Sequence, residues 1–259
     1  MRPACKREPP EMIFRQAVLA TVAALAVLAA IPAAAQQAPA APDRTAVEKI
    51  VREYLMEHPE VVVEAIEEYK RRAEERERLA ADRAVKARAD ELFRDPASPV
   101  GGNAKGDVTV VEFFDYRCGV CKNVHPLVAE LVAKDPGIRR VYKEWPILGP
   151  ESIFAARAAL AAHRQGRYLA FHDALMTARG ALDPAAVFAI AGRAGIDIAR
   201  LKKDMDAPEI EAAIRRNYEL ARALNLNGTP SFLIGNTVLR GARDLDTLRE
   251  LVARARKAG

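Results

Sequence analysis

Two cysteines separated by two residues are the side chains with the clearest chemistry in this sequence. Cys118 and Cys121 lie in "VEFFDYRCGVCKNVHP", directly after an apolar, aromatic-rich run. Such a pair can be half of a zinc site, a structural disulfide or a redox centre. A structural zinc site needs four ligands, but there is no second cysteine pair, and His125, His163 and His172 are scattered along the chain. A disulfide that closes so small a loop constrains the unfolded chain little. Redox chemistry is therefore favoured, with no metal ligand expected.

The elements on either side of the motif should make the two cysteines unequal. "VTVVEFFDY" is typical of a buried strand, and the residues from Gly119 onward are typical of a helix. Cys118 would then face the unpaired N–H groups and the positive dipole end of that helix, which lower the pKa of a thiol. Cys121, one turn further on, should point inward. This arrangement suits a nucleophile, Cys118, and a resolving partner, Cys121, that exchange disulfides through a mixed disulfide. Arg117 and Lys122 add positive charge nearby.

The N-terminus has the pattern of an export signal. A basic start is followed by the apolar "AVLATVAALAVLAAI" and the small-residue "PAAAQQ", which predicts a signal peptide over residues 1–35 with cleavage near Ala35. An uncleaved anchor helix is the alternative, and the same pattern works if translation starts at Met12. The Pro/Ala-rich stretch after Ala35 favours cleavage. We therefore expect the protein in the periplasm.

Removal of residues 1–35 changes both the charge and the cysteine count. It leaves 36 basic and 33 acidic residues, a net charge of +3, which gives no reason to expect nucleic acid as a partner. Cys5 leaves with the leader, so every remaining cysteine belongs to the motif. In an oxidising compartment we expect such a pair to take part in redox chemistry. No 20-residue apolar span follows the leader.

Residues 36–94 are expected to form a helical extension with a tether at 36–43. Five apolar residues recur at helical spacing: Val47, Ile50, Val51, Tyr54 and Leu55. "EHPE" should interrupt the helix, with Pro59 in the first turn of a second one that becomes almost wholly charged. So short a helix pair has too little core of its own. It should pack either on the main domain or on another copy of the chain, and a homo-oligomer through residues 45–70 is the favoured alternative.

The rest of the chain, residues 95–259, reads as an α/β domain. A Pro/Gly boundary at 95–107 precedes the motif, and "IRRVYKEW" predicts a second strand. Residues of about 150–224 are helical, with breaks near Gly166, 180–184 and 192–197. "PSFLIG" and "TVLRGA" predict an antiparallel hairpin that turns at Gly235–Asn236, and a final helix follows an aspartate cap. The order is strand–helix–strand, helical block, strand–strand–helix.

"NGTPSF" adds a Thr–Pro pair directly before a predicted strand, where a cis peptide bond is accessible. With "VEFFDYRCGVCK" and "VYKEWPILGPES", it makes residues 101–259 resemble the DsbA-like branch of thioredoxin-fold proteins. "REYLMEHPEVVVEAIEEY" resembles the extension of the suppressor-of-copper-sensitivity protein C (ScsC) group, which mediates oligomerisation in some members. The resemblance implies a thioredoxin fold with a large helical insertion, preceded by an N-terminal helical extension.

The resemblance also implies roles for individual residues. Cys118 matches the exposed nucleophilic cysteine and Cys121 the resolving one, so the two would form the redox-active disulfide. Pro230 matches the cis-proline beside the active site, and Thr229 the residue whose backbone meets the substrate chain. No metal or organic cofactor is implied.

Glu112 matches the buried acid that helps proton transfer from the resolving thiol. Its alternative role is that of a surface or salt-bridged strand residue. Lys143 is the expected ion-pair partner of Glu112.

The direction of the chemistry depends on the residues around the cysteines. Strong oxidants of the family resemble one another in a Pro-His dipeptide between the cysteines, whereas this chain has Gly119-Val120, which offers no imidazole to the thiolate. Threonine before the cis-proline resembles isomerases and reductases. An isomerase or reductase is therefore preferred over a DsbA-type oxidase. Its partners would be exported client proteins with cysteines and a membrane or periplasmic redox partner.

A protein of another class is the remaining alternative. Cu(I) prefers thiolate ligands, so a non-catalytic periplasmic copper-binding or chaperone protein could use the same cysteine pair.

Overall fold

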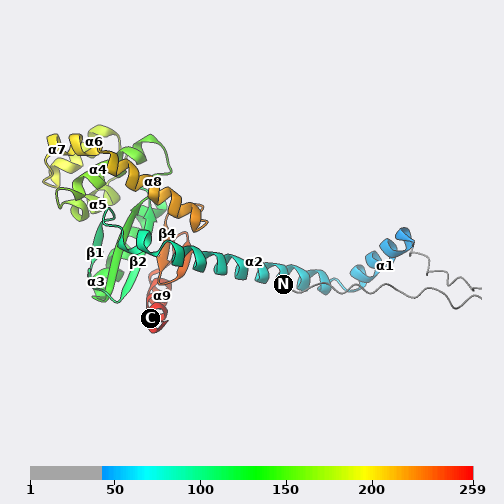
Figure 1. Ribbon diagram of the computed structural model, residues 1–259. Coiled ribbons are helices and arrows are strands. Elements are labelled where there is room, and N and C mark those ends of the chain that lie inside the picture. Colours follow the sequence, from blue (N-terminus) through cyan, green and yellow to red (C-terminus); the bar gives the residue numbers. More distant parts are fainter. Residues whose placement is uncertain (1–42, 259) are drawn as a thin grey trace, which may run out of the picture. The chain divides into compact units, whose positions relative to one another are not determined.

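The computed structural model describes residues 43–258 (Figure 1). The predicted signal peptide, Cys5, Met12 and the cleavage site near Ala35 lie outside the described residues, as does most of the tether. Among residues 43–258, no helix is both long and apolar enough to cross a membrane. The chain divides into two compact units, one ending at Val63 and one beginning at Glu64.

The first unit contains the predicted interruption between two helices. Helix α1, Arg44–Glu57, begins after Asp43, whose carboxylate accepts from the Thr45 N–H at 3.2 Å. It ends at His58 because the residue before a proline is pushed out of helical geometry, and α2 begins at Glu60. No residue of α1 is buried. The exposed apolar side chains of α1 and the start of α2 are Val47, Ile50, Val51, Tyr54, Met56, Val62, Val63 and Ile66.

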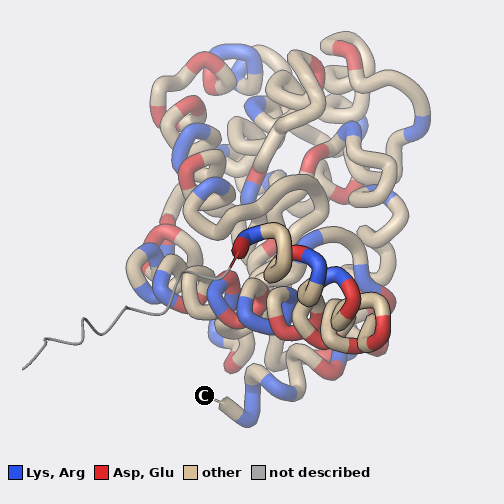
Figure 2. Tube along the Cα trace, turned by 90° about the vertical axis from the view of Figure 1, so that its right-hand side faces the viewer, with Lys and Arg blue, Asp and Glu red and all other residues tan. Residues whose placement is uncertain are grey.

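Helix α2, Glu60–Ala87, becomes charged after its first turns. Its ion pairs are local: Glu68, for example, bonds to both Arg71 and Arg72. Figure 2 shows basic and acidic residues interleaved along the chain, which fits the small net charge. The last turns of α2 differ, because Val85 is buried together with Leu92 from the short π-helical turn η1, Asp90–Arg94.

A five-stranded mixed sheet with the order β1-β3-β2-β4-β5 forms the centre of the second unit. The strands are β1 Val100–Gly102, β2 Val108–Phe114, β3 Ile138–Glu144, β4 Ser231–Ile234 and β5 Thr237–Arg240. Strands β2 and β3 are parallel and connected by α3, Gly119–Lys134, whereas the other neighbours are antiparallel. The predicted β4–β5 hairpin and the final helix α9, Leu245–Ala258, are confirmed. Asp244 accepts from the Thr247 N–H at 2.7 Å, as its capping role requires.

The alternation of side chains along β2 divides the core between the two faces of the sheet. Val108 and Val110 pack with apolar residues of α3 and α9. Val111 and Phe113 point to the opposite face, where they pack with Leu220 of α8, Pro208–Ala223, and with the buried residues of α2 and η1. Because both faces are covered, β2 is almost completely buried, as expected for a central strand.

The helical insertion consists of α4 Pro150–His163, α5 Tyr168–Thr177, α6 Pro184–Arg193, α7 Ile198–Met205 and α8. Its alanine-rich α4 lies at the centre, and its apolar core is continuous with Phe114, Cys118 and Cys121 at the end of the sheet. The predicted breaks are all present. A further break before Pro208 and the three-residue strand β1 were not predicted, since residues 95–107 were interpreted only as a boundary.

Candidate active site

The two cysteines meet at the N-terminus of α3, as the strand–helix junction predicted. Cys118 is the N-cap residue, and its sulfur accepts a hydrogen bond from the Cys121 N–H at 3.3 Å. Its thiol reaches the Thr229 carbonyl oxygen, also at 3.3 Å. Cys118 remains 7% exposed, whereas Cys121 is fully buried. One sulfur is thus accessible from outside and the other is shielded.

Hydrogen bonding makes the two thiols chemically different. The hydrogen bond from Cys121 is the largest of the effects that lower the pKa of Cys118. Contacts with Thr229 and the N–H groups of Cys121 and Val120 lower it further, and together they overcome the opposing effect of burial, so that the pKa of Cys118 falls to about 5. The same hydrogen bond with Cys118, followed by burial, raises the pKa of Cys121. Cys118 is therefore the thiolate and Cys121 the proton donor of the pair.

The neighbouring cations are bonded elsewhere. The Arg117 guanidinium donates to the Leu148 carbonyl and to Glu151, at 2.5 and 3.0 Å. Lys122 Nζ donates to carbonyls at the end of α5, those of Leu175 and Ala178, each at 2.8 Å. These two side chains thus attach the N-terminal part of α3 to the insertion, and the low pKa of Cys118 comes from hydrogen bonds.

Thr229 and Pro230 lie directly beside Cys118, although 111 residues separate Thr229 from it in the sequence. The Thr229–Pro230 peptide bond is cis, as the sequence allowed. Pro230 is buried and Thr229 is half-buried. A segment that ends at the start of β4 therefore forms one wall of the site, with the Thr229 carbonyl directed at the accessible sulfur.

Asp115 shapes the loop between β2 and the cysteines, and sequence reasoning did not single it out. Its buried carboxylate accepts from the Arg117 N–H at 2.7 Å, the Leu148 N–H at 2.9 Å and the Ser152 hydroxyl at 2.7 Å. Its carbonyl accepts from the Cys118 N–H at 3.1 Å. An aspartate that follows a buried strand and lies three positions before the first cysteine of the motif is the signal that could have identified it.

Glu112 is buried under α3, and its ion-pair partner is Arg140. Arg140 donates to Glu112 Oε2 through two nitrogens, at 2.6 and 3.1 Å, with both side chains buried. Glu112 Oε1 is buried with no hydrogen-bond partner among the described residues. The predicted pairing with Lys143 is wrong, because Glu112 faces the same side of the sheet as Arg140 and Tyr142 whereas Lys143 faces the other.

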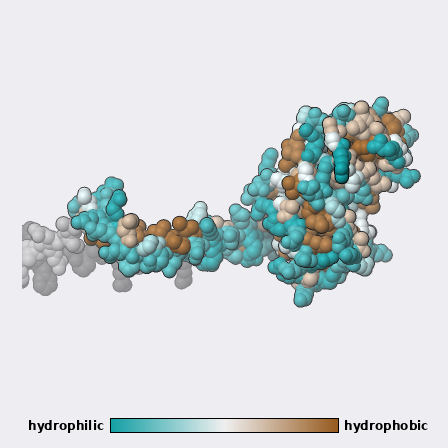
Figure 3. Space-filling model, turned by 180° about the vertical axis from the view of Figure 1, so that it is seen from behind, coloured by the Kyte–Doolittle hydropathy of each residue, from teal (hydrophilic) through white to brown (hydrophobic). Residues whose placement is uncertain are grey.

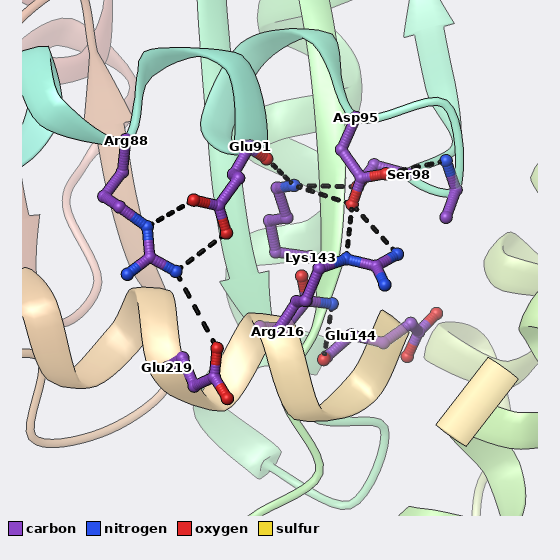
Figure 4. A network of polar contacts seen from close by, with 10 residues as sticks. Arg88, Glu91, Asp95, Ser98, Lys143, Glu144, Arg216 and Glu219 are labelled. Carbon is purple, nitrogen blue, oxygen red and sulfur yellow. Dashed lines mark hydrogen bonds and ion pairs between the residues drawn. The ribbon is translucent and has the colours of Figure 1, made fainter. Parts of the chain in front are cut away.

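Lys143 instead organises a polar cluster on the opposite face of the sheet (Figure 4). Its Nζ donates to the Glu91 carbonyl at 2.5 Å and to the Ser98 hydroxyl at 2.7 Å, and lies 4.0 Å from Asp95. Burial lowers the pKa of Lys143 to about 8. Arg216 of α8 shares Asp95. Lys143 thus joins η1 and the segment after it to the sheet, away from the cysteines.

A buried polar chain beneath the insertion was also not predicted. Glu144 Oε1 accepts from the hydroxyls of Tyr116 and Tyr168, at 2.8 and 2.7 Å, and Tyr116 Oη lies 3.1 Å from His172 Nδ1. Burial raises the pKa of Glu144 to about 8 and lowers that of His172. These residues lie up to 56 positions apart in the chain, so their spacing gave no signal.

Comparison with known proteins decides which family this arrangement represents. Residues 109–253, more than half of the chain, match the family model of the DSBA-like thioredoxin domain. The chain belongs to this family. Residues 43–76 match a second model, that of the copper resistance protein ScsC N-terminal domain. The predicted DsbA-like thioredoxin fold and the ScsC-like extension are thereby confirmed.

Solved structures of similar proteins support the assignment. A thioredoxin-like oxidoreductase from Silicibacter pomeroyi is 50% identical, with a TM-score of 0.65 over 66% of this chain and 98% of that one. The catalytic domain of Proteus mirabilis ScsC is 29% identical, with a TM-score of 0.63 over 68% of this chain and 98% of that one. The thiol-disulfide exchange protein α-DsbA2 from Wolbachia pipientis is 30% identical, with a TM-score of 0.65 over 68% and 96%.

Some relatives contain a similar segment within a longer protein. A Na⁺/H⁺ antiporter NhaA 1 from Salinispora arenicola is 30% identical over 158 residues, which are 60% of this chain but only 24% of the antiporter. The chain thus spans about a quarter of the length of the curated relatives that it matches first. The similarity to the antiporters concerns that shared segment alone.

Proposed function

We propose that this DSBA-like protein exchanges disulfides with exported client proteins in the periplasm. The observation that carries the proposal is the acidified, accessible Cys118 thiol, which lies 3.3 Å from the Thr229 carbonyl beside a buried partner thiol. The Cys118 thiolate attacks a client disulfide and releases one client thiolate. The resulting mixed disulfide is resolved by a second client thiol or by Cys121. The backbone at Thr229 receives the client chain, and Pro230 fixes that backbone.

Glu112 is proposed to move the proton of Cys121. Cys121 must lose its proton before it can attack the mixed disulfide, and both burial and the bond with Cys118 oppose that loss. Glu112 is buried beneath α3 and has one carboxylate oxygen without a hydrogen-bond partner among the described residues. This oxygen would accept the proton of Cys121, directly or through a water molecule. Arg140 orients Glu112 through two hydrogen bonds to Oε2.

The isomerase or reductase direction is the proposed one, with a DsbA-type oxidase as the alternative. Gly119-Val120 brings no charge to the Cys118 thiolate, and Thr229 precedes the cis-proline. The pKa of Cys118, about 5, lies between the values of about 3.5 in DsbA and about 7 in thioredoxin. Because a less acidic nucleophile makes a less oxidising disulfide, this value fits a centre that is milder than DsbA.

Refolding of ribonuclease tests the direction. Scrambled, fully oxidised ribonuclease regains activity only if disulfides are shuffled, whereas reduced ribonuclease needs net oxidation. We expect recovery of the scrambled substrate, and loss of that recovery in Cys118→Ser. Recovery of the reduced substrate alone would overturn the isomerase preference and support the oxidase.

A copper-binding or chaperone protein is the second candidate. It is favoured by the match of residues 43–76 to the copper resistance protein ScsC N-terminal domain and by the affinity of Cu(I) for thiolates. A Cys121→Ala variant separates the two functions, since it should accumulate mixed disulfides with clients if exchange is the function. Stoichiometric Cu(I) binding without any disulfide turnover would support the second candidate instead.

The N-terminal region is proposed to deliver and assemble the protein. Residues 1–35 would be the signal peptide, residues 36–94 the extension, and residues 95–259 the catalytic domain. The apolar side chains of α1 and the start of α2 are largely exposed (Figure 3), as expected for a surface that another copy covers. A membrane or periplasmic redox partner would restore the dithiol after each reductive cycle.

A further inference from the structure

We propose that His125, His172 and Asp173 bind a divalent transition metal ion such as Zn²⁺, at a site separate from the cysteines. His125 comes from α3, one turn after Cys121, and the other two residues come from α5. One ligand atom from each of the three lies within 4.8 Å of the other two. The sequence interpretation treated these histidines as scattered, but the fold brings two of them together.

The distances suit a metal ion. His125 Nε2 lies 3.3 Å from Asp173 Oδ1. A metal ion that holds two ligands at about 2.0–2.1 Å with tetrahedral angles places them about 3.3 Å apart. The ring centroids of His125 and His172 are 5.3 Å apart, so small side-chain rotations are enough to bring a nitrogen of each ring to one ion.

The hydrogen bonds around His172 leave its Nε2 atom free to bind a metal ion. Because Glu144 Oε1 accepts from both tyrosines, the Tyr116 hydroxyl proton is directed to Glu144, and the Tyr116 oxygen is left to accept from His172 Nδ1–H. This network assigns the proton to Nδ1 and leaves a lone pair on Nε2. Nε2 is buried with no hydrogen-bond partner among the described residues, and so is His125 Nδ1.

A buried imidazole nitrogen without a partner, such as His172 Nε2, is costly unless something binds there. A histidine that ligates a metal ion commonly donates its other N–H to an oxygen, which fixes the orientation of the ring. The chain from His172 through Tyr116 to Glu144 has this form.

An ion could enter from the surface and would find suitable donors. The Asp173 side chain is 62% exposed, and His125 borders a surface pocket together with Lys122, Met176 and Arg179. Of the nearby cations, Arg140 is paired with Glu112, and the ammonium group of Lys122 is bonded to carbonyls. Two imidazoles and one carboxylate suit Zn²⁺ or Cu²⁺ better than Mg²⁺ or Ca²⁺, and a water molecule can complete the coordination.

Titration of the oxidised protein, purified without the predicted leader that carries Cys5, with Zn²⁺ tests the proposal. In that form Cys118 and Cys121 are joined as a disulfide, so neither can act as a thiolate ligand. We expect one Zn²⁺ per chain by calorimetry, and Co²⁺ should give the visible absorption of a tetrahedral site without thiolate charge transfer. Because the disulfide form is used, the result is independent of whether the exchange function proposed above is correct.

Substitutions identify the ligands. Asp173→Asn, on the surface, and His172→Phe, which keeps an aromatic ring in its cluster, should each weaken Zn²⁺ binding at least tenfold. Tyr116→Phe, which only removes the acceptor of the His172 N–H, should weaken it about 10- to 100-fold. The controls His163→Phe and Asp206→Asn change exposed residues elsewhere in the insertion and should leave binding unchanged.

Two results would overturn the proposal. One is the absence of stoichiometric Zn²⁺ binding by the oxidised protein. The other is equal affinity of the parent, Asp173→Asn and His172→Phe proteins, which would assign the bound ion to other surface groups. If His172→Phe does not fold, Asp173→Asn decides, since its side chain is exposed.

Discussion

At the scale of single residues, the reactivity of the centre depends on the ionisation of Cys118. Its pKa is lowered to about 5, so the thiolate predominates at neutral pH. We expect alkylation of the reduced protein by iodoacetamide to rise with a midpoint near pH 5 and to level off above it. Cys121, which is buried and whose pKa is raised, should not react until the protein unfolds. A midpoint near 8.5, the value of a free cysteine, would contradict the proposed thiolate.

The same ionisation couples the redox state to stability. The folded-state pKa of Cys118 is depressed, so its stabilisation of the dithiol form is present above the unfolded-state pKa and is lost as pH falls through about 5. The urea midpoint of the reduced protein, measured against that of the oxidised protein, should therefore rise between pH 5 and 9. Cys118→Ala should remove this trend.

Val120, between the cysteines, is the position that should determine how oxidising the Cys118–Cys121 disulfide is. It is 49% exposed, and its N–H helps to lower the pKa of Cys118. Val120→His adds a cationic group that stabilises the thiolate, and each further pKa unit makes the disulfide more oxidising by about 30 mV. Equilibration with glutathione measures the change, and Val120→Phe is the control for size without charge. An unchanged potential in Val120→His would refute this role.

Glu112 can be tested separately from Cys118. Glu112→Gln keeps a side chain that can bond to Arg140 but cannot take up the proton of Cys121. We expect resolution of a preformed mixed disulfide to slow by roughly 100-fold, while alkylation of Cys118 keeps its rate. Thermal denaturation of the variant provides the control, because loss of a buried ion pair also lowers the stability of the protein. Equal slowing of mixed-disulfide resolution and of Cys118 alkylation would indicate that Glu112 has a structural role only.

The pairing of Glu112 shows what sequence reasoning could not supply at this scale. The alternation of side chains is visible in the sequence, but the register between β2 and β3 is not. That register sets Glu112 opposite Tyr142, so Arg140 shares its face and Lys143 does not. The position of a thiolate at a helix start, by contrast, follows from local sequence, which is why Cys118 could be predicted.

At the scale of elements, the predictable parts were those with a local pattern. The helices follow the spacing of apolar residues and the positions of prolines and glycines, and the hairpin follows Gly235–Asn236. Strand β1 has only Val-Gly-Gly, and it exists because β3 pairs with it, so nothing local indicated a strand. The convergence of α3 and α5 at His125 and His172 likewise depends on tertiary packing.

The buried chain that links β3 to α5 should make the domain sensitive to pH. The folded-state pKa of Glu144 is raised to about 8 by burial, although both tyrosine bonds oppose the shift. Its contribution to stability is present below its unfolded-state pKa, near 4.5, and is lost as pH rises through about 8. Glu144→Gln can accept the same two bonds without ionising, so its stability should fall less between pH 5 and 8.

Urea unfolding at several pH values measures how much unfolding free energy each protein loses between pH 5 and 8. The part of this loss that is due to Glu144 is at most about 5 kcal/mol. Glu130→Gln, at an exposed surface pair on α3, is the control and should change the pH profile little. Parallel profiles of the parent and Glu144→Gln proteins would show that Glu144 does not titrate in this range.

At the scale of the whole molecule, the last part of the proposed extension is packed into the same core as the sheet. Sequence composition placed the boundary near residue 94, but Val85 and Leu92 are buried against the sheet with Val111 and Phe113. Lys143 also bonds to the Glu91 carbonyl. Deletion through residue 94 would remove part of the core, at a cost of roughly 1.5–3 kcal/mol for each large apolar side chain. Loss of assembly in such a variant would not be interpretable.

A deletion of residues 36–63 is therefore the sharper test of self-association. It removes the exposed apolar side chains of α1 and the first turn of α2, and it leaves the compact unit that begins at Glu64. We expect the parent to sediment as an oligomer and the deletion variant as a folded monomer with an unchanged Cys118 titration. Ile50→Asp should give the same dissociation, because burial of an unpaired carboxylate is costly. Leu79→Asp, at an exposed position in the charged part of α2, should not. The proposed oligomerisation through the exposed apolar side chains of α1 and the start of α2 would be refuted by either of two results. One is a parent protein that is already monomeric, and the other is a deletion variant with an unchanged oligomeric state.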